Sequence, residues 1–163
     1  MSAEQISEMV LDLYAARSEA REYLDFFVSP DIEKKLDKSR LSIKKEMSRN
    51  SKGRNKSRST RIRRFIKDIS SLNPGAEPVA EIMTFAVETF CEVGSDQIIK
   101  TSVQNGYARL LHDTIIYIND AGLVGDYLPR IEKAVDSMPS GWWRGNEFKK
   151  LLKQELKETM ESL

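Results

Sequence analysis

Apolar residues recur every three or four positions along almost the whole chain, and this spacing constrains the fold more than any other feature of the sequence. The clearest example forms one stripe along a helix: Val79, Ile82, Met83, Ala86, Val87, Phe90 and Cys91. No stretch alternates between apolar and polar residues for long enough to propose a strand. The pattern therefore predicts an all-α fold, and 40% apolar with 31% charged residues is typical of a soluble helical protein.

Turn residues divide the chain into about seven helices. Ser29 and Pro30 are expected to begin the second helix, as cap and first-turn residue. Gly94 is expected to end the fourth, with Ser95 capping the fifth. The expected helices cover approximately residues 3–28, 30–48, 60–72, 79–94, 95–121, 126–138 and 144–163. No repeat period is evident, so we predict a single domain of residues 1–163 folded as an irregular bundle, with a repeat-like helical stack as the second choice.

The first expected helix is strongly amphipathic. Its apolar stripe consists of Ile6, Met9, Val10, Leu13, Ala16, Ala20, Leu24 and Phe27. Acidic residues occupy the opposite face: Glu4, Glu8, Asp12, Glu19, Glu22 and Asp25. The pattern indicates one long helix with an acidic outer face.

Positive charge is concentrated in one segment. Residues 44–67 contain eleven Lys or Arg and a single acid, Glu46, so this segment carries +10 in a chain whose total is +1. Residues 48–59 contain no apolar side chain, which predicts a mobile surface loop. The following helix should turn Ile62, Phe65, Ile66 and Ile69 inward and its cations outward. The candidate binding residues are Lys52, Arg54, Lys56, Arg58, Arg61, Arg63, Arg64 and Lys67.

Guanidinium and ammonium groups beside a helix N-terminus suit phosphate oxygens, so the leading hypothesis is a non-enzymatic module that binds the backbone of RNA or DNA. The alternative is a protein–protein scaffold or homo-oligomer that pairs acidic with basic surfaces. A further possibility is that the same cations lie against the acidic face of the first helix. Trp142 and Trp143 are adjacent and cannot both face one core, so one of them is a candidate partner contact.

The sequence offers little that favours an enzyme. The single histidine, His112, has no second ligand at helical spacing, which favours a position at the edge of the core or on the surface. Cys91 lies on an apolar stripe and is expected to be a buried, inert thiol. Glu88 and Glu92 fit a solvated helix face, and no phosphate-binding glycine motif occurs. We therefore predict no catalytic residue, no metal site and no cofactor.

Several motifs resemble a known family of small helical proteins. They include residues 11–17, 63–68, 72–74, 80–83 with Glu88, 117–124, 129–133 and 141–142. The family is bacterial and is catalogued as a domain of unknown function. The resemblance implies an all-helical bacterial protein and supplies no catalytic residue.

The first residues resemble no signal peptide, and the longest apolar run, residues 114–118, is far shorter than a bilayer span. A cytoplasmic protein without membrane contact is therefore the expectation.

Overall fold

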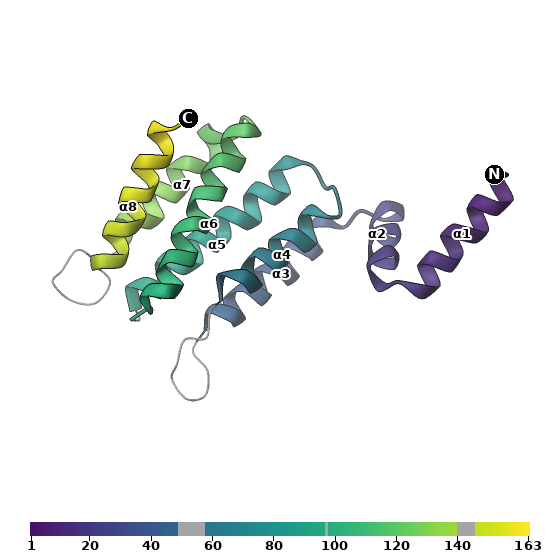
Figure 1. Ribbon diagram of the computed structural model, residues 1–163, viewed down its shortest axis with the longest axis horizontal. Helices are drawn as coiled ribbons and strands as arrows, with labels where there is room; N and C mark the ends of the chain where they lie inside the picture. Colours follow the sequence, from purple (N-terminus) through teal and green to yellow (C-terminus); the bar gives the residue numbers. More distant parts are fainter. Residues whose placement is uncertain (49–57, 97, 140–145) are drawn as a thin grey trace.

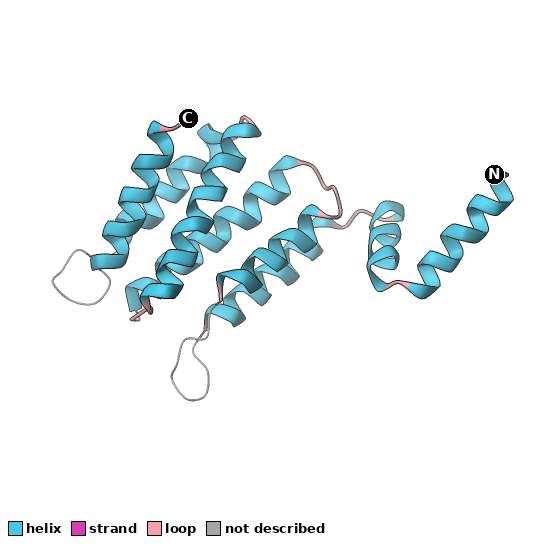
Figure 2. Ribbon diagram, in the orientation of Figure 1, coloured by secondary structure: helices cyan, strands magenta, loops and turns pink. Residues whose placement is uncertain are grey.

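The computed structural model describes residues 1–48, 58–96, 98–139 and 146–163, and the described residues form helices without any strand (Figures 1 and 2). This confirms the predicted all-α fold. The helices of the described ranges are α1 (Ala3–Ala16), α2 (Ser18–Val28), α3 (Ile32–Met47), α4 (Ser59–Ser70), α5 (Ala76–Asp96), α6 (Thr101–Asp120), α7 (Val124–Ser137) and α8 (Asn146–Glu161).

The prediction of a single helix over residues 3–28 is wrong, because the helix is interrupted at Arg17. Arg17 has an extended backbone, with φ −129° and ψ 120°, and separates α1 from α2. Arg21 then donates from Nε to the Tyr14 carbonyl at 3.3 Å and from Nη2 to the Ala15 carbonyl at 3.4 Å. These bonds satisfy carbonyl groups that the end of α1 leaves unpaired, so the break has its own stabilising contacts.

Helices α3 to α8 are arranged as three antiparallel pairs stacked side by side in two layers. Helices α3, α5 and α7 contact one another in sequence along one layer, and α4, α6 and α8 do so along the other. Each pair is closed by contacts between its own two helices. This order corresponds to the repeat-like stack that was the second choice from the sequence.

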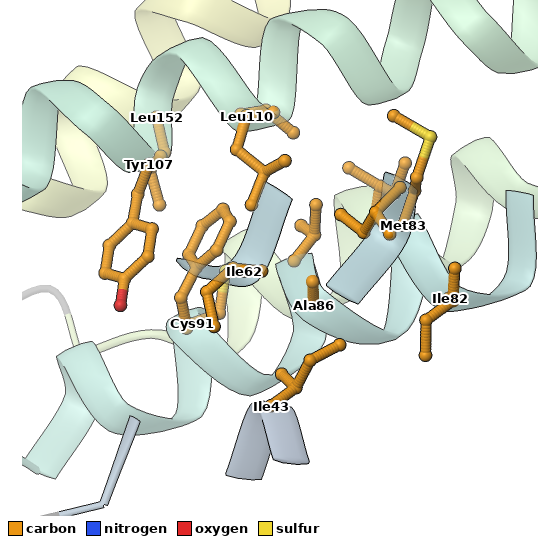
Figure 3. Packing of buried hydrophobic residues seen from close by; sticks show 14 of the residues in the cluster. Ile43, Ile62, Ile82, Met83, Ala86, Cys91, Tyr107, Leu110 and Leu152 are labelled. Carbon is orange, nitrogen blue, oxygen red and sulfur yellow. The ribbon is translucent and has the colours of Figure 1, made fainter. Parts of the chain in front are cut away.

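The core runs through this stack. Buried side chains from both layers meet there, including Ile43 of α3, Ile62 of α4, Met83 of α5, Leu110 of α6 and Leu152 of α8 (Figure 3). Helix α5 contacts α3, α4, α6 and α7, which explains why it is apolar over most of its circumference.

Gly94 is not a C-cap, contrary to the expectation, but lies inside α5. A Cβ at this position would stand 2.7 Å from a ring carbon of Phe148, so the glycine makes room for this side chain of α8. Ser95 is likewise helical, and its hydroxyl donates to the Cys91 carbonyl at 2.8 Å. Helix α6 begins only at Thr101.

The cap of α3 also differs from the expectation. Ser29 follows the last residue of α2, and Asp31 is the N-cap, its Oδ1 accepting a bond from the Lys34 amide at 3.1 Å. The Asp31 amide in turn donates to the Ser29 carbonyl at 2.9 Å, so the chain turns at Pro30 immediately before the cap. Over the described ranges, no helix combines the length and the apolar character required to cross a membrane.

Candidate anion-binding surface on α4 and α6

Helix α4 fixes the directions of the cations that follow the predicted basic loop. Ile62, Ile66 and Ile69 are at most 8% exposed and hold one side of the helix against the core. Arg64 and Lys67 are exposed on the opposite side, and Arg58 is exposed at the N-cap position. Within the described residues these three cations make no ion pair or hydrogen bond through their side chains. Their charges are therefore presented to solvent in defined directions.

Two other arginines of α4 are paired within the fold. Arg61 Nη1 lies 3.1 Å from Glu46 Oε2 of α3, although the Arg61 side chain remains 63% exposed. Arg63 donates from Nη1 to Asp113 Oδ2 of α6. The two pairs place α4 between α3 and α6 and neutralise part of the positive charge. Because both arginines remain substantially exposed, each pair contributes little to stability on its own.

The acidic side chains of α1 and α2 neutralise little of the positive charge of α4. Among the described residues, the one ion pair that joins these two helices to the stack is Glu22 with Lys35, at 3.7 Å. The pKa of Glu19 is lowered, mainly by a backbone N–H bond and by the Ser18 hydroxyl, with smaller effects of Arg17 and Arg64. The field of Arg64 thus reaches Glu19 without a direct contact. Among the described residues, the cations of α4 therefore form no ion pair with the acidic face of α1 and α2, and Arg64 acts on Glu19 only over a distance.

A groove of about 680 Å³ opens beside the N-terminus of α4, between this helix, α6 and α8. Its lining residues are Ser59, Thr60, Arg63, Gly106, Arg109, His112, Asp113 and Glu155. Gly106 permits this arrangement, since a Cβ there would stand 2.4 Å from Ser59 Oγ. Arg109 is exposed and, within the described part of the chain, has no ion pair, so it adds a free cation from α6.

The basic surface is defined here as Arg58 at the N-cap of α4, Arg61, Arg63, Arg64 and Lys67 of α4, and Arg109 of α6. No described side chain caps the first turn of α4, and the Ser59 and Thr60 hydroxyls lie at the groove. Amide N–H groups, hydroxyls and guanidinium groups are the donors that bind phosphate oxygens in proteins. The exposed cations of the basic surface are therefore suited chemically to anions, whereas the groove itself also contains the carboxylates of Asp113 and Glu155.

The groove contains His112, for which the sequence favours a position at the edge of the core or on the surface and predicts no cluster; its side chain is 43% exposed. His112 Nδ1 lies 2.9 Å from Thr159 Oγ1 and 3.2 Å from Glu155 Oε1. Both partners belong to α8, so their proximity depends on tertiary structure. A local signal was nevertheless present, because Gly106, Arg109 and Asp113 recur at helical spacing on a face of α6 that carries few apolar residues.

Several candidate residues lie outside the described residues. They are Lys52, Arg54 and Lys56 of the basic loop and the adjacent pair Trp142 and Trp143. Their proposed roles remain predictions from the sequence.

A second polar cluster links three helices of the other layer. Arg130 of α7 binds Glu81 through Nη1 at 2.6 Å and Glu88 through Nη2 at 3.0 Å, both on α5. Arg40 of α3 also reaches Glu81, at 3.3 Å. The hydrogen bond from Arg130 lowers the pKa of Glu81 most strongly. Because these arginines and glutamates pair with one another, we interpret the cluster as a structural link between the helices.

No group of side chains suited to holding a metal ion occurs in the described ranges. Cys91 is 2% exposed, which confirms the expected buried thiol, and burial raises its pKa to about 12.

Comparisons with known proteins identify a family but no function. Neither the curated proteins nor the solved structures include a match to this chain. The model of one family, described as a family of unknown function, DUF6155, matches residues 1–155. This match covers almost the whole chain and confirms the resemblance to a domain of unknown function. The chain belongs to the family of unknown function DUF6155.

Proposed function

We propose that this protein is a non-enzymatic binding module that contacts the backbone phosphates of RNA or DNA through the basic surface. The observation that carries the proposal is that Arg64 and Lys67 of α4, and Arg58 at its N-cap, are exposed and form no ion pair within the described residues. Arg61 and Arg63, by contrast, each pair with an acid of a neighbouring helix.

Two further features support the proposal. The sequence adds four cations immediately before α4, at Arg49, Lys52, Arg54 and Lys56. The groove beside the first turn of α4 offers hydroxyl and guanidinium donors from two helices. Contacts of this kind neutralise phosphates without reading bases, so binding should have little sequence selectivity.

The test is the binding of fluorescently labelled duplex DNA and single-stranded RNA to the full chain, measured by anisotropy over a range of salt concentrations. If about five phosphates of the duplex are neutralised, log K should fall against log salt with a slope near −4.5. Lys67→Gln and Arg64→Gln should each reduce the slope by about 1. An affinity that is absent, or independent of salt, would rule the proposal out.

The chain offers a matched control on the other layer. Lys133 of α7 is exposed and, like Lys67, has no ion pair within the described residues. Lys133→Gln removes the same charge from a distant helix and should leave the slope unchanged. An equal loss in Lys67→Gln and Lys133→Gln would mean that net charge alone governs binding and that α4 forms no site.

A second candidate function is assembly of the chain through acidic and basic complementarity. The observation that favours it is that residues 1–28 contain six acidic and two basic side chains, nearly all exposed, whereas α4 is strongly basic. Such an assembly would form without nucleic acid and weaken in salt, which light scattering would detect.

A further inference from the structure

Helices α1 and α2 form an arm that projects beyond α3 and away from the stack (Figure 1). They contact each other, and neither has a buried residue. The arm nevertheless has a defined shape, because the Tyr14 hydroxyl donates to Asp25 Oδ1 at 2.8 Å and the Arg21 guanidinium lies over the Tyr14 ring. A short helix is marginal in water unless its apolar side is covered. The arm therefore presents a formed but uncovered surface.

This surface is the main exposed apolar area of the described chain. Ten of the thirteen exposed large apolar side chains in the described residues belong to positions 1–28. On α1 they form a stripe of Ile6, Met9, Val10 and Leu13, each 36–46% exposed. On α2, Phe27 is 75% exposed. The arm stripe is defined here as these five residues.

We propose that the arm stripe packs against the arm stripe of a second copy of this chain, forming a symmetric dimer. Elsewhere in the described residues, the exposed large apolar side chains are Leu41, Ile98 and Leu163, on separate parts of the chain. The stack thus offers no apolar surface of matching extent among these residues. The arm of a second copy does, since a two-fold axis brings the same stripe to face itself.

The size of the surface allows a contact of modest area. The five side chains of the arm stripe are 36–75% exposed and can bury roughly 500 Å² on each arm. Two arms would then bury roughly 1,000 Å² in total, about the lower limit for a specific interface.

The response to salt distinguishes this dimer from the assembly proposed above, in which acidic surfaces pair with basic ones. Glu4, Glu8 and Asp12 lie on the side of α1 opposite the stripe, and the arm carries six acidic against two basic side chains. Two arms packed through their apolar sides repel each other through these acids. Salt screens that repulsion, so the proposed dimer should persist or tighten as salt rises. A contact between the acidic arm and the basic surface would weaken instead.

The test is sedimentation equilibrium of the full chain, freed of nucleic acid, at about 0.05 M and about 0.5 M salt. Met9→Gln combined with Leu13→Gln should raise the dimer Kd at least about ten-fold. Leu11→Gln is the matched control, because Leu11 is 67% exposed on another side of the same helix. It should leave Kd within about three-fold. Circular dichroism should show native helix content in all variants, since none of these side chains is buried.

A third variant gives opposite results for the two modes of assembly. Glu4→Gln, Glu8→Gln and Asp12→Asn together remove repulsion between arms, so the proposed dimer should tighten. An assembly based on charge complementarity should weaken. The proposal is overturned if the chain is monomeric at every concentration and salt, if the stripe variant dimerises like the wild type, or if salt and the acid-free variant weaken association. None of these results depends on whether the basic surface binds nucleic acid.

Discussion

The Phe148 ring of α8 rests against the bare Cα of Gly94 in α5. A Cβ at position 94 would stand 2.7 and 2.8 Å from two ring carbons and 3.1 Å from the terminal methyl of Met138. The ring is 2% exposed and is itself packed near Phe90 and Tyr107, so it has little room to move. The glycine therefore leaves the space that the Phe148 ring occupies against α5.

Gly94→Ala should destabilise the fold by about 1–2 kcal/mol, because overpacking costs more than the helix propensity gained by alanine. The measurement is urea unfolding followed by circular dichroism. Gly125→Ala is the control, since a Cβ at that helical position meets nothing within 4 Å. It should be neutral or stabilising by up to about 1 kcal/mol. Equal effects of the two substitutions would contradict the close contact between Gly94 and Phe148.

Acid should destabilise the protein through Glu81. Its pKa is lowered below the ordinary value of 4.5, first by the hydrogen bond from Arg130 and also by Arg40. A carboxyl group with a depressed pKa in the fold contributes stability above its unfolded pKa, and this contribution is lost as pH falls from about 5 through the folded pKa. The unfolding free energy should therefore decline below about pH 5.

Glu81→Gln should flatten this decline and lower stability at pH 7 by about 1–2 kcal/mol, a value reduced for solvent screening because Arg130 is 37% exposed. Urea titrations at several pH values would measure both effects. Glu92→Gln, an exposed position on the same helix, should keep the wild-type pH dependence. If the unfolding free energy of Glu81→Gln fell as steeply with pH as that of the wild type, other groups would cause the acid sensitivity.

The sequence predicted the class of the fold because local periodicity determines it. The stripe from Val79 to Cys91 needs no tertiary information to be recognised as helical. The break at Arg17 does not follow from the sequence, because both halves of residues 3–28 keep the same apolar spacing and the contacts that stabilise the break come from Arg21. The sequence predicts a cap at Gly94 because a glycine near the end of a stripe usually is one. Its contact with Phe148 depends on α8, far along the chain.

The candidate site was predictable in part, because local helical periodicity also determines which side chains of one helix face outward. The outward direction of Arg64 and Lys67 follows from Ile62, Ile66 and Ile69 on the same helix. By contrast, the pairing of Arg63 with Asp113 and the position of His112 beside Glu155 join residues 43–50 positions apart. Such contacts carry no local signature, because the packing of α4 and α8 on α6 determines them.

Cys91 should be unreactive in the native protein. Its thiol is buried, and burial, with the charge of Glu88 as a smaller effect, raises its pKa to about 12. At pH 8 a disulfide reagent should therefore modify the native chain at least about a hundredfold more slowly than the chain unfolded in urea. The absorbance of the released thiolate measures both rates. Rapid modification without denaturant would show that α5 opens readily at this position.

Arg63 and Arg64 are neighbours in sequence, and their substitution should separate stability from binding. Arg63 pairs with Asp113 of α6, whereas Arg64 has no ion pair within the described residues. Arg63→Gln should cost about 0.5–1 kcal/mol of unfolding free energy, and Arg64→Gln less than about 0.5 kcal/mol. Both should weaken a contact with phosphates, because each removes one cation from the basic surface.

A double-mutant cycle isolates the pair. Asp113→Asn combined with Arg63→Gln should lose less stability than the sum of the single changes, with a coupling of about 0.5–1 kcal/mol. Asp113→Asn combined with Arg64→Gln should be additive within about 0.3 kcal/mol. If Asp113 were coupled to Arg64 and not to Arg63, then Arg63 would be the arginine without an ion pair. Arg63→Gln would in that case be the variant that tests phosphate binding. The expected result leaves Arg64 as the position where nucleic-acid affinity can be changed without altering the fold.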